Sequence, residues 1–175
     1  GVTRPIHAIP LGIDPGYFNP QIRTSRVSER YTFLSVFEWG ERKAPELLMR
    51  AFNEEFRFDE PVVLVCKILN ADTSVDVHDQ IRNLELNPAG GSIHVSLNQV
   101  VPTYQLGMVY RSADCFVLTT RGEGWGMPIL EAMACGCPPV ACGTGGAAEL
   151  IEDGETGVLV PAVDAPALAH SLIEL

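Results

Sequence analysis

The sequence predicts an α/β fold built on a doubly wound parallel β-sheet with helices on both faces. Short strand-like segments alternate with segments of helical spacing along most of the chain. The strand-like segments are apolar throughout, as is typical of strands covered on both faces. The chain has 175 residues, of which 46% are hydrophobic and 19% charged, a composition typical of one folded domain.

The expected strands are short runs of apolar and β-favouring residues that turn-forming residues separate. They cover residues 32–37, 62–66, 92–96, 114–119, 139–141 and 157–160. The expected helices cover residues 45–56, 74–86, 103–112, 128–135, 147–151 and 164–175.

Two of these helices carry recognisable local features. The second expected helix has Val77, Ile81 and Leu84 on one face, and Ser74 is its expected N-cap. The fourth begins with Pro128, which suits the first position of a helix because that position needs no backbone N–H.

Charge and cysteine content exclude several classes of protein. Twenty-two acidic against 12 basic residues give a net charge of −10, so a general nucleic-acid or anionic-membrane surface is not expected. The five cysteines form no CxxC pair, and we interpret them as reduced thiols of a cytoplasmic protein without a metal site. No apolar run approaches the roughly 20 residues needed to span a bilayer.

The loop after the first expected strand contains two adjacent bases, Arg42 and Lys43, directly before a helix. The chain has neither a GxGxxG fingerprint after this strand nor a Walker A motif, which argues against a dehydrogenase or a P-loop protein. A guanidinium fork beside an ammonium suits a diphosphate. A solvated surface pair is the other interpretation of the same two residues.

The loop after the fourth expected strand contains Gly122, Gly124 and Gly126, and a proline that starts a helix follows. Free amides at a helix N-terminus suit a phosphate. Glu123 in this loop and Glu131 in the first turn of the helix would repel a phosphate but could accept hydrogen bonds from the hydroxyls of a sugar and a ribose. Alternatively, the glycines form a tight turn and Glu131 stabilises the helix dipole.

Residues 123–138, EGWGMPILEAMACGCP, resemble the E-x7-E signature of the retaining GT-B glycosyltransferases of "group 1", or family four. Four further segments are similar to family stretches, in the family's order: IPLGID (9–14), ERKAP (41–45), GGAAE (145–149) and DGETGVLV (153–160). Trp125 stands where the family usually has Phe, and Lys67 could be either a phosphate-side base or a surface lysine.

The resemblance implies that the chain is the C-terminal, donor-binding half of a two-domain enzyme. Residues 1–30 would be an interdomain linker and residues 31–175 a Rossmann-like nucleotide-sugar-binding domain. The N-terminal acceptor domain would be absent from this chain, so we expect the chain alone to be inactive.

The same resemblance implies a set of site residues. Glu131 would bind the ribose hydroxyls, Glu123 would contact the donor sugar, and the base would lie near the loop 97–100. Arg42 and Lys43 would stabilise the departing diphosphate. The implied catalytic residues are Glu123, Arg42 and Lys43, and the implied donor-binding residues are Gly124, Trp125, Gly126, Met127, Glu131, Leu97 and Val100.

The implied partners follow from this role. The donor would be a UDP-, GDP- or ADP-linked sugar, with no metal and no other cofactor, and any membrane association would come only through the absent domain. Two alternatives stay open: a GT-B phosphorylase or synthase that uses a sugar phosphate, and a non-catalytic nucleotide-binding module.

Overall fold

The computed structural model describes residues 5, 7, 9–26 and 28–174. Some positions of the expected linker (1–4, 6, 8 and 27) and the last residue of the final expected helix lie outside the described residues. The strands are β1 (Tyr31–Glu38), β2 (Val62–Leu69), β3 (Ile93–Leu97), β4 (Cys115–Leu118), β5 (Pro139–Cys142) and β6 (Val158–Val160). The helices are α1 (Pro45–Glu55), α2 (Val77–Arg82), α3 (Thr103–Arg111), α4 (Met127–Ala134), α5 (Ala147–Leu150) and α6 (Ala165–Ile173), with a short 3₁₀ turn, η1 (Glu41–Lys43).

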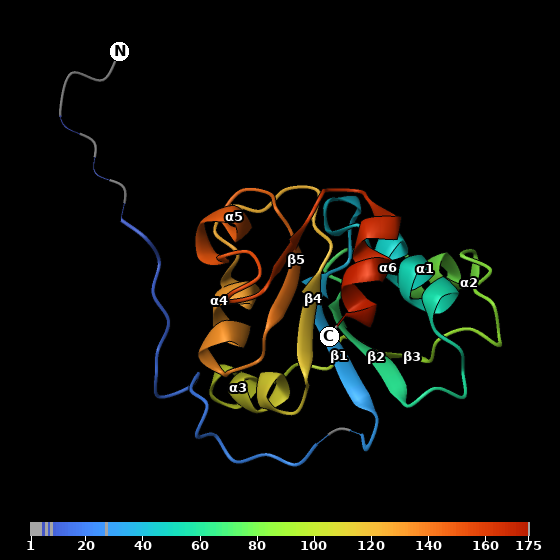
Figure 1. Cartoon of the computed structure of the whole chain (residues 1–175), viewed down its shortest axis with the longest axis horizontal. Helices are drawn as coiled ribbons and strands as arrows, with labels where there is room; N and C mark the ends of the chain where they lie inside the picture. The colour runs from blue at the N-terminus through green and yellow to red at the C-terminus, as the bar shows by residue number, and fades with distance from the viewer. Residues whose placement is uncertain (1–4, 6, 8, 27, 175) are drawn as a thin grey trace.

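All strand pairs are parallel, and the strand order is β3-β2-β1-β4-β5-β6. Helices α3, α4 and α5 lie on one side of the sheet and α1, α2 and α6 on the other (Figure 1). Every residue of β4 and β5 is buried, as expected for central strands covered on both faces. The predicted α/β doubly wound sheet is confirmed.

The core is continuous across the sheet. Phe33 of β1 packs against Phe52 of α1 and against Phe56, which follows that helix, with ring centroids 5.7 and 6.0 Å away. All five cysteines are buried free thiols. No helix of the described residues is long and apolar enough to cross a membrane.

The second expected helix is the largest disagreement between the sequence prediction and the structure. Helix α2 is limited to Val77–Arg82, and its N-cap is Asp76, whose carboxylate accepts from the Asp79 N–H at 3.0 Å. The predicted cap, Ser74, instead donates its hydroxyl to Asp72 at 2.6 Å. The helix ends early because Glu85 adopts a positive φ of 50°, which a helix cannot continue.

Strand β2 is longer than the sequence predicts, because it continues to Leu69 instead of ending at Cys66. Its backbone stays paired with β1 as far as Leu69 and with β3 as far as Ile68. The polar residue that suggested a strand end, Lys67, therefore lies within the strand. The other strands and α1, α3, α4 and α5 match the predicted ranges to within one residue at each end.

Part of the expected linker packs on the domain. The Tyr17 and Phe18 N–H groups both donate to the Asp14 carbonyl at 3.0 Å, which forms a turn. This turn places the Phe18 side chain, only 5% exposed, in the core beside Tyr110 of α3.

Candidate functional site

The crevice between β1 and β4 is the point at which the strand order reverses. The chain runs from β1 outward to β3, and then returns to the other side of β1 to begin β4. The connections that leave β1 and β4 therefore diverge to opposite faces of the sheet and open a crevice at the carboxyl ends of the strands, where ligands bind in open α/β sheets.

The two loops that follow β1 and β4 are tied together at this crevice. The Arg121 N–H donates to the Arg42 carbonyl at 2.8 Å, and the Thr120 hydroxyl donates to the same carbonyl at 3.2 Å. The buried Thr119 hydroxyl lies 3.3 and 3.2 Å from the carbonyls of Lys43 and Ala44. These bonds hold the basic loop in a defined position relative to the glycine-rich loop.

Lys43 and Glu123 form a buried ion pair across the two loops. The Lys43 Nζ lies 2.5 Å from a Glu123 carboxylate oxygen, and the two side chains are only 9% and 11% exposed. Arg42 lies 3.6 Å from the same oxygen with its side chain 57% exposed, and it donates to the Gly122 carbonyl at 2.8 Å. The interpretation of Arg42 and Lys43 as a solvated surface pair is therefore wrong for Lys43.

Close backbone packing supports the glycine-rich loop. Gly126 has a φ of 86° and precedes α4. A Cβ on Gly145, whose φ is 54°, would lie 1.7 Å from the Glu123 carbonyl oxygen, and one on Gly146 would lie 2.1 Å from that of Trp125. Only glycine permits this approach, so the segment after β5 forms the floor beneath residues 123–125.

Glu131 lies on α4, on the side that faces α3. It lies in the second turn of the helix, since α4 begins at Met127, and the first turn contains no acidic residue. The prediction that Glu131 occupies the first turn and stabilises the helix dipole is therefore wrong, as is the assignment of Pro128 to the first position. The Tyr110 hydroxyl donates to Glu131 Oε2 at 2.7 Å. Burial raises the pKa of the Glu131 carboxyl, and the hydrogen bond from Tyr110 partly offsets this rise.

A cavity of about 480 Å³ opens at the crevice. Four of the predicted site residues line it: Arg42, Lys43, Val100 and Glu131. Glu123 is joined to the cavity through its ion pair with Lys43. Other lining residues include Glu38, Lys67, Gln99, Leu106, Tyr110 and Pro128.

The remaining predicted donor-binding residues do not line this cavity. Leu97 is half-buried at the end of β3 and packs against the core. The other four residues of this group follow Glu123: Gly124, Trp125 and Gly126 lie in the loop, and Met127 begins α4. The Trp125 indole N–H donates to the Leu11 carbonyl at 3.2 Å, which gives the larger ring a partner in the segment before the domain.

Two residues that the sequence left open or did not indicate also belong to this site. The Lys67 ammonium donates to the Gln99 carbonyl and so ties β2 to the loop after β3. Burial lowers the pKa of Lys67. Tyr110 was not predicted at all: the only signal in the sequence was a tyrosine in an apolar environment, where a buried hydroxyl needs a partner.

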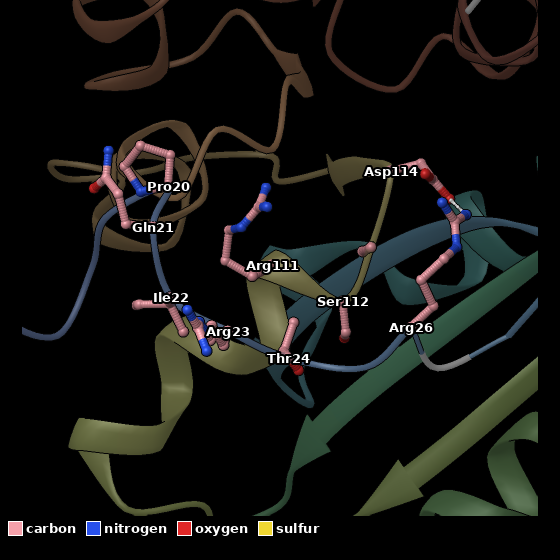
Figure 2. Close-up of a pocket in the computed structure, with 10 residues that line it drawn as sticks. Pro20, Gln21, Ile22, Arg23, Thr24, Arg26, Arg111, Ser112 and Asp114 are labelled. Atoms are coloured by element: carbon pink, nitrogen blue, oxygen red, sulfur yellow. Dashed lines mark hydrogen bonds and ion pairs between the residues drawn. The ribbon is translucent and has the colours of Figure 1, made fainter.

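A larger cavity, of about 630 Å³, lies away from the crevice, between residues 20–26 and the C-terminal end of α3. Figure 2 shows Arg26 and Asp114 pointing toward each other there, and their side chains are 2.5 Å apart. Arg111 donates to the Cys135 carbonyl at 3.4 Å, at the end of α4. These guanidiniums join elements of the fold, and no predicted site residue lines this cavity.

The doubly wound sheet and its crevice define a Rossmann-like α/β domain. A family model described as "Glycosyl transferases group 1" matches residues 29–175, and the chain belongs to this family. The chain is 32% identical, over 89% of its length, to a D-inositol 3-phosphate glycosyltransferase of Geodermatophilus obscurus, of which it covers 37%. It is 29% identical, over its whole length, to a GDP-mannose-dependent α-(1-6)-phosphatidylinositol monomannoside mannosyltransferase of Mycolicibacterium smegmatis, of which it covers 48%. The chain thus spans less than half the length of these relatives.

Solved structures agree on the fold. The C-terminal domain of the group 1 glycosyl transferase LpcC from Francisella tularensis superposes with a TM-score of 0.75 at 21% identity, covering 94% of this chain and 87% of that domain. An Anabaena protein solved with UDP and glucose gives a TM-score of 0.67 at 22% identity, over 83% of this chain and 38% of that one. The fold is that of a GT-B C-terminal domain.

Proposed function

We propose that this chain binds the nucleotide-diphosphate sugar donor of a glycosyltransferase that transfers the sugar with retention. The observation that carries the proposal is the convergence of Arg42, Lys43 and Glu123 from two distant loops, beside a cavity that also contains Glu131. Two cations suit a diphosphate, and two carboxylates suit the hydroxyls of the two sugars that flank it.

The arrangement of the crevice supports a specific orientation of the donor. Arg42 and Lys43 would hold the diphosphate, and the amides of residues 124–127 would meet the distal phosphate and the sugar. Glu123 would accept from the transferred sugar, and Glu131 would accept from the ribose. The base would lie against the loop 97–100, of which Val100 is 83% exposed and lines the cavity.

The chemistry of such a transfer needs stabilisation of the leaving group. As the bond between the anomeric carbon and the phosphate oxygen breaks, negative charge grows on the diphosphate, and the fixed charges of Arg42 and Lys43 would stabilise it. The leaving phosphate would accept the proton of the attacking acceptor hydroxyl on the same face of the sugar. The proposal requires no metal.

The relatives support a nucleotide-sugar donor. The Mycolicibacterium enzyme is described as GDP-mannose-dependent, and the Anabaena protein is described in complex with UDP-glucose. We propose that acceptor binding, any membrane contact and completion of the catalytic cleft belong to a further domain of a cytoplasmic enzyme. On this proposal, the chain alone binds donor weakly and transfers sugar negligibly.

The test is a titration of ¹⁵N-labelled protein with UDP, GDP and ADP, followed by NMR. We expect one nucleotide to bind preferentially and to shift the resonances of residues 40–44, 98–101 and 122–131. The resonances of the residues that line the cavity beside Arg111 should not shift. Glu131→Ala should weaken binding, whereas Glu155→Ala, at an exposed position in the turn before β6, should not. Shifts confined to the Arg111 cavity, or no binding by any nucleotide, would contradict the proposal.

A further inference from the structure

Among the described residues that line the 480 Å³ cavity, only Tyr110 has a side-chain hydroxyl. The residue is fully buried, at 0% exposure, and its hydroxyl donates to Glu131 Oε2 at 2.7 Å. Burial raises the pKa of this phenol well above 10, so the hydroxyl stays protonated and always acts as a donor toward the carboxylate. The carboxylate of α4 is thus oriented from a neighbouring helix.

The Tyr110 ring is itself held from two sides. Phe116 of β4 meets it edge-on, with centroids 5.6 Å apart, and Phe18 lies 6.3 Å away on the segment that precedes the domain. Ring pairs in this range of distances restrict rotation and stabilise one orientation. The position of the hydroxyl is therefore determined by the core rather than by solvent.

The hydrogen bond also limits what Glu131 can do. A glutamate side chain has three rotatable bonds, and orienting it on ligand binding would cost conformational entropy. Because the Tyr110 hydroxyl already bonds Oε2, the Glu131 side chain is ordered before any ligand binds. Glu131 lines the cavity, and its other carboxylate oxygen is left to accept from a ligand. A preorganised acceptor binds a hydroxyl more tightly than a mobile one.

We propose that Tyr110 is a positioning residue that fixes the Glu131 carboxylate for a ribose hydroxyl and so makes the site selective for ribonucleotides over deoxyribonucleotides. The inference rests on the proposed function, because it assumes that a nucleotide occupies the crevice. It extends that function from a side chain that contacts the nucleotide to one that acts through another residue.

The experiment compares two ligands on the intact protein: the nucleoside diphosphate that binds best among UDP, GDP and ADP, and its 2′,3′-dideoxy analogue. Tyr110→Phe preserves the buried ring and removes only the hydroxyl. Loss of one hydrogen bond to a charged group should weaken ribonucleotide binding about tenfold. Binding of the dideoxy analogue should stay unchanged, because it has no hydroxyl for Glu131 to accept from.

Two further variants separate positioning from a general structural effect. Ser112→Ala removes another buried hydroxyl bond of the same helix end, the 2.7 Å bond to the Val109 carbonyl, and should leave both affinities unchanged. In a Glu131→Ala background, Tyr110→Phe should cause no further loss. An equal loss for both ligands, or no loss for the ribonucleotide, would overturn the role of Tyr110.

The same titrations distinguish failure of this inference from failure of the proposed function. If the wild-type protein binds none of the nucleotides, the donor-binding proposal fails, and the inference fails with it. If the wild-type protein binds the ribonucleotide and its dideoxy analogue equally well, nucleotide binding stands, but the ribose contact of Glu131 and the role of Tyr110 are both wrong.

Discussion

Replacing Lys43 by methionine should destabilise the domain markedly, because it leaves the Glu123 carboxylate buried without its main partner. The two side chains are 9% and 11% exposed, and removal of one partner of a buried pair costs about 3–5 kcal/mol. Arg42, at 3.6 Å and largely exposed, should recover up to about 1 kcal/mol of this. We therefore expect a loss of about 3 kcal/mol in the free energy of unfolding, or a fall of roughly 6–12 °C in Tm.

The assay is urea denaturation of four proteins: wild type, Lys43→Met, Glu123→Gln and the double variant. The double variant should be more stable than the sum of the single losses predicts, by about 1–3 kcal/mol, because neither charge is then left alone. The matched control is Arg57→Met, which removes a cation from an exposed pair with Asp59 and should cost less than about 1 kcal/mol. Equal losses for Lys43→Met and Arg57→Met, or strict additivity in the double variant, would refute the reasoning.

Three further predictions concern the supporting loop, the carboxylate and the thiols. Gly145→Ala should lower the free energy of unfolding by at least about 2 kcal/mol, because the new Cβ would clash with the Glu123 carbonyl oxygen and the residue has a positive φ. The control Gly124→Ala should cost under about 0.5 kcal/mol, because no atom lies within 4 Å of the new Cβ. Burial raises the pKa of the Glu131 carboxyl above 4.5, so the folded state favours the protonated carboxyl more than the unfolded state does. The ionised carboxylate therefore destabilises the folded protein as pH rises above 4.5. Glu131→Gln should therefore be more stable than wild type in urea at pH 7, with a difference that shrinks below pH 4; a constant difference would contradict this. Burial raises the pKa of Cys66 to about 12 and all five cysteines are buried, so Ellman's reagent should detect no thiol in the native protein and five after unfolding.

Local sequence patterns were sufficient for most of the secondary structure. Apolar runs identified every strand, and the proline and glycine around α4 marked its beginning to within one residue. The prediction failed at α2, where Asp76 caps the helix and Ser74 instead donates its hydroxyl to Asp72. It also failed at the end of β2, where pairing with both neighbouring strands outweighs the polar character of Lys67.

The candidate site could be predicted only in part. The sequence placed the candidate site in the loops after the first and fourth strands, and the structure joins these two loops at one edge of the sheet, as parallel strands require. Leu97 lies half-buried at the end of β3, packs against the core and does not line the crevice cavity, so its contact with the donor stays a prediction. Tyr110 was missed because its partner, Glu131, lies on another helix, and the close approach of Gly145 to Glu123 was not predicted although the GGAAE stretch was singled out.

The sequence by itself therefore determined the alternation of strands and helices, the fold class and the membership of the group 1 glycosyl transferases. These depend on hydrophobic periodicity and on motifs, which are local in the chain. Only the tertiary structure decided that Lys43 is buried against Glu123, 80 residues away, and that the Tyr110 hydroxyl donates to Glu131. Such contacts depend on the order in which the strands assemble and on how closely two loops pack, and neither is encoded by a pattern within any one segment.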